Sequence, residues 1–385
     1  MVPRDIPDEF PLATRVNYLN SAGVGLIPKS VVEKIKWFYQ RGLETPSYPE
    51  LFEENARIVE RVRTQFASFI NATRSELSFQ TNASTSMSNV VRGIEFRKGD
   101  NVIIDDLGFP SATYPVVGLR KKGVEVRMLR NREGYVSAED YERAMDGRTR
   151  LVVVTFVSWI NGMRADVEAI GRLARETGAY LMVDATHGTG YLGVDVERWG
   201  AQFVVTSNYK WLLSPFGASE FYMSSEVLDE FEPLQVGWHS ALGDSRALRP
   251  DVYQLPRSAR KFEPGNPDYA AIFGLGQSLR FLESFGLPEV ERRALGLSRQ
   301  IIEGARGAGV EVLTPRDDRK RSAIVFLRSK GRSGAELAKK LKKRGIWVSG
   351  RYFERSSGIR ISPYFYNTER NIEDLIDALK QIGAT

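Results

Sequence analysis

Two apolar runs that end in charged side chains stand out in the middle of this sequence. Tyr180–Asp184 reads YLMVD and ends in a carboxylate, whereas Phe203–Lys210 reads FVVTSNYK and ends in an amine. Short, almost wholly apolar runs are typical of strands that are buried on both faces of a parallel sheet. Because ligands of such sheets bind beyond the carboxyl ends of the strands, Asp184 and Lys210 are expected to meet at one site.

Strand-like and helical segments alternate around these runs, which predicts a mainly parallel sheet covered by helices on both faces, an α/β fold. The expected strands are Leu77–Gln80, Asn101–Asp105, Val124–Leu129, Arg150–Phe156, Tyr180–Asp184 and Gln202–Ser207. The expected helices are one that Pro28 opens, Leu51–Ile70, Ser86–Gly93, one after Pro110, and Asp166–Thr177. The glycine-rich segment Tyr18–Gly25 is expected to be a loop.

The pattern changes after about Phe262. The expected elements there are a helical region Tyr269–Gly307, a strand Ala323–Leu327, a helix Gly334–Arg344, two strands Ile346–Ser349 and Gly358–Ser362, and a helix Thr368–Ile382. A chain of 385 residues exceeds the size of most single cores. We therefore predict an N-terminal arm (residues 1–20), a large domain (residues 21–265) and a smaller C-terminal α+β domain (residues 266–385).

The composition excludes several kinds of site. Because the chain has no cysteine, it has no disulfides, thiolate metal ligands or cysteine nucleophiles. With two histidines, His187 and His239, we predict no metal site. The net charge of +6 does not indicate nucleic acid, because the basic cluster at residues 339–344 has helical apolar spacing and no interleaved aromatic residues.

Membrane association is not expected either. No apolar stretch approaches the roughly 18 residues that a membrane-spanning helix needs. No apolar signal region follows Met1–Asp5. We therefore expect a cytoplasmic protein that binds neither membranes nor nucleic acid.

An amine and a carboxylate at neighbouring strand ends are the two groups that a pyridoxal phosphate site requires. The amine forms a Schiff base with the cofactor aldehyde, and the carboxylate keeps the pyridine nitrogen protonated. A lysine after a strand is more often a solvated surface charge, and an aspartate there can cap the following turn. The interpretation therefore depends on the surrounding residues.

Three segments carry a resemblance to a known family: Val183–Gly188 (VDATHG), Ser207–Leu212 (SNYKWL) and Gly358–Ser362 (GIRIS). In this order and spacing they resemble the class V aminotransferase family of fold-type I pyridoxal phosphate enzymes, with the isopenicillin N epimerase-like and kynureninase-like branches as the nearest. The resemblance covers nearly the whole chain. It implies a large domain with a mainly parallel seven-stranded sheet covered by helices, and a smaller C-terminal α+β domain.

The resemblance implies roles for four residues around the cofactor ring. Lys210 matches the Schiff-base lysine, and Asp184 matches the carboxylate that pairs with the pyridinium nitrogen. His187 resembles the histidine or glutamine that hydrogen-bonds near the cofactor phenolate oxygen; a histidine satisfied within the core is the alternative. Phe109 matches an aromatic residue that stacks on the ring.

Four further residues are implied as phosphate ligands. Ser84 and Thr85 lie at a strand-to-helix turn, where free N–H groups and hydroxyls suit a phosphate; helix capping is the other explanation. Ser207 and Tyr209 flank the lysine. Tyr209 departs from the commonest family pattern, which has histidine before the lysine, and the tyrosine variant resembles the two branches named above.

The substrate side is implied less completely. Arg360 resembles the family's carboxylate-binding arginine, whose guanidinium presents a bidentate fork. Arg351 is a weaker candidate for the same pocket. Asn20 and Trp159 are expected to line it, although an ordinary core position is the alternative for Trp159.

Gly265 and Asn266 match a loop that in relatives reaches the phosphate of the neighbouring subunit. A tight turn explains the local sequence just as well. The resemblance therefore implies a homodimer with its active sites at the subunit interface.

We predict an enzyme that acts on the Cα of an amino acid, with transamination as the first choice and lyase, hydrolase or epimerase chemistry as alternatives. Cysteine desulfurases of the persulfide type need a catalytic cysteine, which this chain lacks. A regulator of this fold would carry a DNA-binding domain, for which the chain has no room. A ligand-binding protein without catalysis is the non-enzyme alternative.

Overall fold

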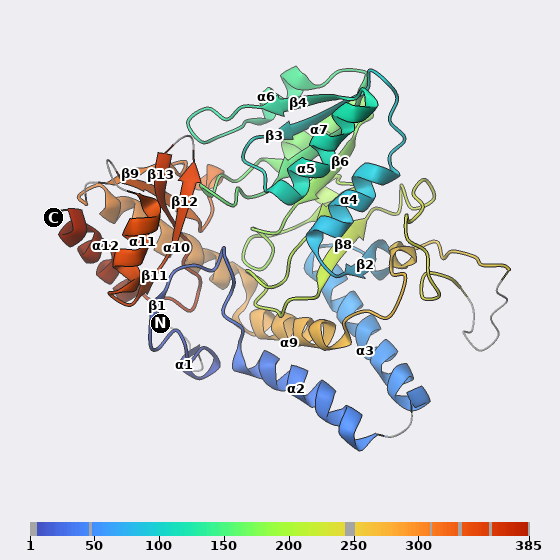
Figure 1. Cartoon of the computed structure of the whole chain (residues 1–385), viewed down its shortest axis with the longest axis horizontal. Coiled ribbons are helices and arrows are strands. Elements are labelled where there is room, and N and C mark those ends of the chain that lie inside the picture. Colours follow the sequence, from blue (N-terminus) through green and yellow to red (C-terminus); the bar gives the residue numbers. More distant parts are fainter. Residues whose placement is uncertain are drawn as a thin grey trace.

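A seven-stranded sheet in the order β2-β8-β7-β6-β5-β3-β4 forms the centre of the molecule (Figure 1). The computed structural model describes residues 6–45, 48–242, 251–308, 310–329, 333–353 and 356–383. The strands are β2 Leu77–Gln80, β3 Asn101–Asp105, β4 Glu125–Leu129, β5 Thr149–Thr155, β6 Tyr180–Asp184, β7 Phe203–Val205 and β8 Ser219–Met223. Only β8 runs antiparallel to its neighbours in this sheet. The predicted mainly parallel sheet is therefore confirmed.

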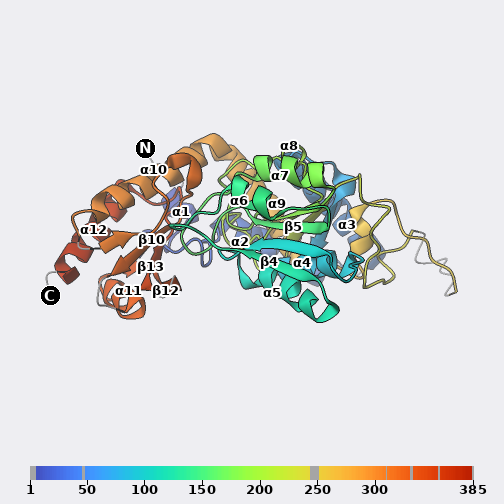
Figure 2. The same cartoon turned by 90° about the horizontal axis from the view of Figure 1, so that it is seen from above.

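Alternating side chains of the central strands pack into two separate cores. Leu181 and Val183 of β6 lie in one core, and Met182 between them lies in the other. The helices around the sheet are α2 Lys29–Glu44, α3 Tyr48–Phe69, α4 Ala83–Gly93, α5 Pro110–Gly118, α6 Ala138–Ala144, α7 Val167–Thr177, α8 Val196–Trp199 and α9 Tyr269–Phe285. Figure 2 shows α7 and α8 on one side of the sheet and α4 and α5 on the other. Both faces are covered, which explains why these strands are apolar throughout.

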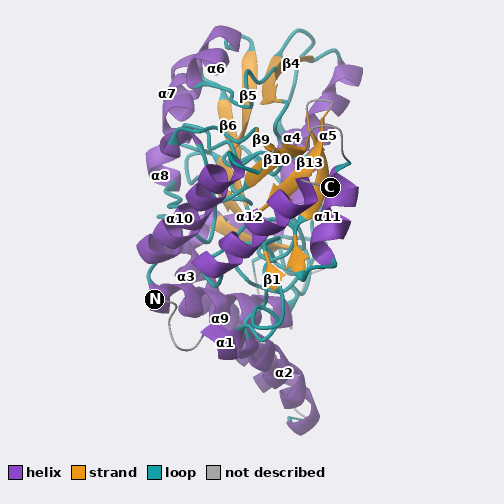
Figure 3. Ribbon diagram, turned by 90° about the vertical axis from the view of Figure 1, so that its left-hand side faces the viewer, coloured by secondary structure: helices purple, strands orange, loops and turns teal. Residues whose placement is uncertain are grey.

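A smaller C-terminal unit follows α9. Its four-stranded antiparallel sheet has the order β12-β13-β10-β9 and packs with α10, α11 and α12 (Figure 3). The elements are α10 Leu287–Ala305, β9 Val310–Val312, β10 Val325–Ser329, α11 Gly334–Lys342, β11 Ile346–Trp347, β12 Ser349–Phe353, β13 Ser356–Ile361 and α12 Glu369–Gly383. The predicted α+β character is confirmed. The limits 1–20, 21–265 and 266–385 remain a prediction; α9 itself packs against α2 and α3.

The N-terminal segment is more ordered than the predicted loop. After the short helix α1 (Ile6–Glu9), strand β1 (Asn17–Tyr18) pairs in parallel with β11, and Asn20 bridges to Ser362. These pairings hold the start of the chain against the C-terminal unit (Figure 1). The register could not be predicted because its partner lies more than 300 residues away in the sequence.

Three other expectations need correction. Strands β8, β9 and β12 were not predicted; Glu220 interrupts the apolar pattern of β8, and Arg351 that of β12. The helical region after Tyr269 is two helices, separated at Gly286, whose φ of 77° ends α9. Helix α4 begins before Ser86, since the Asn82 side chain accepts a hydrogen bond from the Thr85 N–H and caps it.

Across the described ranges, no helix combines the length and the apolar character needed to cross a membrane.

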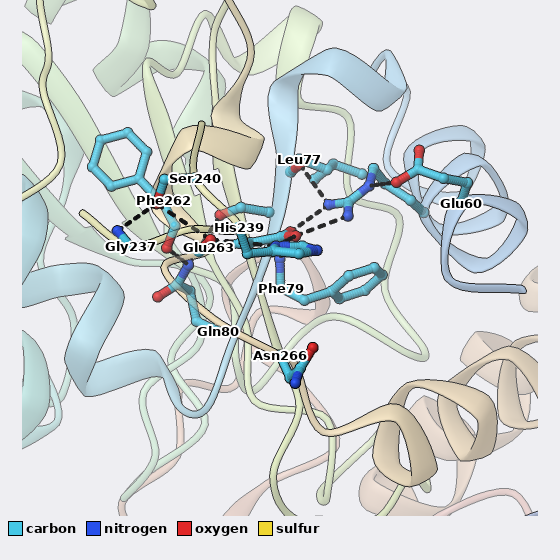
Figure 4. Close-up of polar contacts among 12 residues, drawn as sticks. Glu60, Leu77, Phe79, Gln80, Gly237, His239, Ser240, Phe262, Glu263 and Asn266 are labelled. Atoms are coloured by element: carbon cyan, nitrogen blue, oxygen red, sulfur yellow. Dashed lines mark hydrogen bonds and ion pairs between the residues drawn. The ribbon is translucent and has the colours of Figure 1, made fainter. Parts of the chain in front are cut away.

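A buried ion pair joins the loop ahead of α9 to the edge of the large sheet. Arg63 of α3 donates to both carboxylate oxygens of Glu263, at 2.6 and 3.1 Å, and the Phe79 N–H donates to the same carboxylate at 2.7 Å (Figure 4). The side chains of Arg63 and Glu263 are 3% and 1% exposed. Glu263 thereby connects α3 and β2 to the loop that carries Gly265 and Asn266.

Removal of this carboxylate should strongly destabilise the fold. Glu263→Ala is expected to lower the free energy of unfolding by about 3–5 kcal/mol, because it leaves the Arg63 guanidinium buried without its main partner. Glu60→Ala is the matched control: Glu60 pairs with the same arginine at 3.1 Å but its side chain is 43% exposed, so its loss should cost less than about 1 kcal/mol. Urea unfolding followed by circular dichroism measures both. Equal losses in the two variants would contradict this role of Glu263.

Candidate active site

The carboxyl ends of four parallel strands bring the predicted residues to one edge of the large sheet. Phe109 follows β3, Trp159 follows β5, Asp184 ends β6, and Lys210 follows β7. In the register, Thr155 lies opposite Asp184, and Asp184 lies opposite Val205. The strands thus end level with one another, as a shared site requires.

The Lys210 amine is enclosed by aromatic side chains. Lys210 is only 7% exposed, and its Nζ lies 5.4 Å and 5.6 Å from the ring centroids of Phe109 and Tyr209. Burial lowers the pKa of Lys210 to about 8, Asp184 opposes this shift, and Arg360 adds to it. An amine with this pKa is a free base in a substantial fraction of molecules near neutral pH, which a nucleophilic lysine needs.

His187 bridges Trp211 and Lys210, and these contacts fix its tautomer. The Trp211 Nε1–H donates to His187 Nδ1 at 3.2 Å, and His187 Nε2 lies 3.1 Å from Lys210 Nζ. Burial lowers the pKa of His187 well below its ordinary value, and Lys210 and Arg360 lower it further. The neutral ring therefore carries its proton on Nε2 and donates it to the amine. Only an unprotonated Lys210 can accept this hydrogen bond.

Asp184 is a buried carboxylate with few partners. Within the described residues, its hydrogen bonds come from Thr186, whose N–H lies 3.1 Å from Oδ1. Burial raises the pKa of Asp184, while Thr186 and the charge of Lys210 lower it. A cationic N–H beside the second oxygen would stabilise the ionised form.

Arg360 of β13 lies across from the amine, among neutral acceptors. It is 2% exposed, and its Nη1 donates to the Trp159 carbonyl oxygen at 2.8 Å. Its Nη2 lies 3.5 Å from Asn20 Oδ1, and its buried Nε has no hydrogen-bond partner in the part of the chain that the structure describes. The Trp159 ring packs edge-on against Phe109, with 5.4 Å between the ring centroids. These contacts bring the predicted substrate residues Arg360, Asn20 and Trp159 together on one side of the site.

The residues predicted to hold phosphate lie at two helix starts and beside the lysine. Ser84 at the start of α4 donates to the Ser111 hydroxyl at the start of α5, at 2.7 Å. The Asn82 side chain caps the Thr85 N–H, so the capping explanation holds for Thr85. Ser207 is half-buried, and Tyr209 stacks on Phe216 at 4.3 Å. Hydroxyl and N–H donors gathered at two helix starts suit an anion, although Ser84 and Thr85 now donate to Ser111 and Asn82 and would have to exchange these partners for it.

Gly265 and Asn266 lie apart from the amine in this single chain. Asn266 is exposed, and its Oδ1 accepts a hydrogen bond from Tyr269 at 3.4 Å. In Figure 4 Asn266 lies apart from the hydrogen-bonded residues around Glu263, and no dashed line reaches it. Among the described contacts, none joins either residue to Lys210, so their predicted role depends on a second subunit.

The loop that carries Lys210, between β7 and β8 (here called the lysine loop), is supported by two contacts that were not predicted from the sequence. Glu220 of β8 is buried and accepts hydrogen bonds from Thr206 Oγ1 and Asn208 Nδ2, both at 2.6 Å; burial raises the pKa of Glu220 to about 7. A Cβ at Gly25 would lie 1.9 Å from the Lys210 carbonyl oxygen, so only glycine fits there. A carboxylate within the run SEFYM (219–223) was the available signal for Glu220.

This fold, together with a buried lysine that faces an aspartate at the strand ends, defines a class of protein: the fold-type I pyridoxal phosphate enzymes. The family model for class-V aminotransferases matches residues 17–375, and the chain belongs to that family. A probable cysteine desulfurase of Methanothermobacter thermautotrophicus is 30% identical, over 100% of this chain and 98% of its own length. A probable cysteine desulfurase of Pyrococcus abyssi is 27% identical, over 99% of this chain and 98% of its own length.

Solved structures agree with this assignment. The apo cysteine desulfurase of Thermococcus onnurineus NA1 superposes with a TM-score of 0.92 at 25% identity, covering 100% of this chain and 98% of that chain. The C-DES protein shares the fold, with a TM-score of 0.87 at 20% identity over 97% of this chain and 98% of its own, and was solved with glycine covalently linked to its pyridoxal phosphate. The family is pyridoxal phosphate-dependent.

The family was predicted correctly, but the branch was wrong. The relatives are cysteine desulfurases rather than isopenicillin N epimerase-like or kynureninase-like proteins. Tyr209 was the residue that favoured those branches. A single side chain next to the lysine is not enough to distinguish the branches of this family, because it does not determine the chemistry of the site. The chain is related to cysteine desulfurases although it contains no cysteine.

The residues present fit pyridoxal phosphate. Lys210 offers a free amine for the aldehyde, and Asp184 keeps an oxygen for the pyridine N–H. Phe109 is 36% exposed beside the amine and could cover a flat ring. The orphan Nε of Arg360 needs an acceptor, which a substrate carboxylate would supply.

Capture of the cofactor should report the pKa of Lys210. The rate at which cofactor-free protein binds added pyridoxal phosphate is expected to rise roughly tenfold from about pH 7 to about pH 9 and then level off, because the pKa is about 8. Stopped-flow absorbance of the bound cofactor measures this rate, and Lys210→Ala is the control that should give no covalent capture. A rate that still rises steeply beyond about pH 9, as for an ordinary lysine, would refute the depressed pKa.

Proposed function

We propose that this chain is a pyridoxal phosphate enzyme that activates the Cα of an α-amino acid, with Lys210 as the amine for the cofactor aldehyde. The observation that carries the proposal is the buried Lys210 amine, 3.1 Å from the neutral His187 ring and near Asp184. Bound at this site, the cofactor supplies an electron sink for the bond broken at Cα.

Each residue then has a defined task. Arg360 binds the substrate carboxylate and thereby orients one Cα bond, and Asp184 holds the proton on the pyridine nitrogen. Lys210 Nζ takes the proton from Cα as a general base. Once His187 no longer donates to the amine, its Nε2–H is available to the phenolate oxygen.

We also propose the remaining cofactor contacts and a homodimer. Phe109 covers the ring, and the phosphate is held by Ser84, Thr85, Ser207 and Tyr209. Gly265 and Asn266 would reach the phosphate of the neighbouring subunit, which the exposed position of Asn266 permits. The substrate pocket would then lie at the subunit interface.

Transamination is the reaction we propose first, because one base on one face of the substrate is enough: Lys210 removes the proton from Cα and returns it to the cofactor carbon. Epimerisation would require a second proton donor on the opposite face. The non-enzyme alternative, a binding protein, does not account for a buried amine whose pKa is lowered to about 8 beside a neutral His187 ring.

The relatives favour a second candidate, β-elimination from a sulfur-containing amino acid. The two curated relatives cited above are named probable cysteine desulfurases, and a protein of the same fold, C-DES, is named a cystine C-S lyase. Without a cysteine, this chain cannot carry sulfur as an enzyme persulfide. The Cβ–S bond would instead break with its electron pair leaving on sulfur, and hydrolysis of the remaining fragment would give a 2-oxo acid and ammonia.

Product analysis of cofactor-loaded protein distinguishes the candidates. Transamination gives a 2-oxo acid without ammonia and leaves the cofactor as pyridoxamine phosphate, whereas elimination gives a 2-oxo acid and ammonia together. Lys210→Ala is expected to reduce turnover by at least roughly 10²–10⁴-fold because the base is lost; Lys36→Ala, whose side chain is 58% exposed, is the control that should leave turnover unchanged. Full activity in Lys210→Ala would contradict the proposal, and binding without turnover of any amino acid would support the binding-protein alternative.

A further inference from the structure

The hairpin of β12 and β13 places two arginines on the same face of the small sheet. In its antiparallel register Arg360 lies opposite Ser349, and Arg351 lies opposite Gly358. Arg351 and Arg360 are therefore diagonal neighbours across the strand pair, and the Cα atoms of such neighbours are roughly 7–8 Å apart. Side chains as long as those of arginine can contact one another at this separation. Gly358, opposite Arg351, has no side chain that could separate the two.

Both guanidinium groups converge on Trp159. Arg360 donates to the Trp159 carbonyl oxygen at 2.8 Å, and Arg351 Cζ lies 6.0 Å from the centroid of the Trp159 ring. The Trp159 ring contacts Phe109, whose centroid is 5.4 Å from Lys210 Nζ. A short series of contacts thus leads from the reactive amine to both arginines.

Neither arginine has an acidic partner among the described residues. Arg351 donates to the Gly350 carbonyl oxygen at 3.2 Å, and Arg360 bonds to Trp159 and Asn20, all neutral acceptors. The Nε atoms of both are buried, and neither has a hydrogen-bond partner within the described ranges. Burial lowers the pKa of each, and Arg351 lowers the pKa of Arg360 further. Two neighbouring cations, one buried and one half-buried, with no counter-charge among the residues that the structure describes are costly, so the site calls for an anionic ligand.

We propose that this pair selects a substrate with two anionic groups. Arg360 binds the α-carboxylate, and Arg351 binds an acidic group at the end of the side chain, with the Trp159 ring against the carbon atoms between them. The substrate class is then the acidic α-amino acids and the corresponding dicarboxylic 2-oxo acids. This inference rests on the proposed function, because it assigns Arg360 to the α-carboxylate. Arg351 is the specificity-determining residue.

Two unreactive five-carbon acids test the pair directly. Glutarate and valerate differ by one carboxylate, and we expect cofactor-loaded protein to bind glutarate at least about tenfold more tightly by isothermal titration calorimetry. Arg351→Met should remove most of that preference while leaving valerate binding unchanged, and Arg351→Lys should retain part of it. Arg319→Met, at a side chain that is 91% exposed in the same unit, is the matched control and should keep the full preference.

The outcomes separate this inference from the function on which it rests. Equal binding of the two acids by the unaltered protein, or an undiminished preference in Arg351→Met, would overturn the role of Arg351. If the same samples show the absorbance of cofactor bound at Lys210 and turn over neutral amino acids as well as acidic ones, only the specificity inference fails. If no cofactor binds at Lys210, the proposed function itself fails.

Discussion

Burial of the Lys210 amine, which lowers its pKa to about 8, is the constraint on which the site depends, and the His187 ring held between Trp211 and Lys210 offers the free base a hydrogen-bond donor. An ammonium group cannot accept the Nε2–H, and the ring cannot reverse its tautomer while Trp211 donates to Nδ1. Burial and the Arg360 charge act in the same direction, since both disfavour the protonated lysine. The protein thus keeps part of the Lys210 population as the reactive free base near neutral pH, in a nearly dry site.

The rest of the structure supports this arrangement from several sides. The hydroxyl oxygen of Tyr364, in the C-terminal unit, lies 2.8 Å from each of the carbonyl oxygens of Gly190 and Trp211, which share its single proton. Glu220 holds the residues that precede the lysine, and the Gly25 N–H donates to the Tyr209 carbonyl oxygen at 2.9 Å. Segments from the beginning, middle and end of the chain therefore meet at the lysine loop. Loss of the contacts from any one of these segments should displace the Lys210 amine before it causes the large sheet to unfold.

Much of the fold could be predicted because burial leaves a clear sequence pattern. Asn101–Asp105 and Tyr180–Asp184 match β3 and β6 residue for residue, since apolar runs in a two-sided sheet end where polar turn residues begin. β8 was missed because buried Glu220 is satisfied by contacts that only the tertiary structure supplies. The strand ends also predicted that Asp184 and Lys210 share a site. The His187 tautomer and the alignment of Arg351 with Arg360 could not be predicted, since they depend on packing and on hairpin register.

The relation to cysteine desulfurases raises a chemical question, because this chain shares their fold but contains no cysteine. What the chain retains is the lysine, its carboxylate and the arginine across from it. Borohydride reduction of cofactor-loaded protein, followed by peptide mass mapping, tests this centre most directly. We expect a pyridoxyl-phosphate mass on the peptide that contains Lys210 and none on exposed lysines such as Lys36. Folded, cofactor-saturated protein without an adduct at Lys210 would contradict the assignment of this amine.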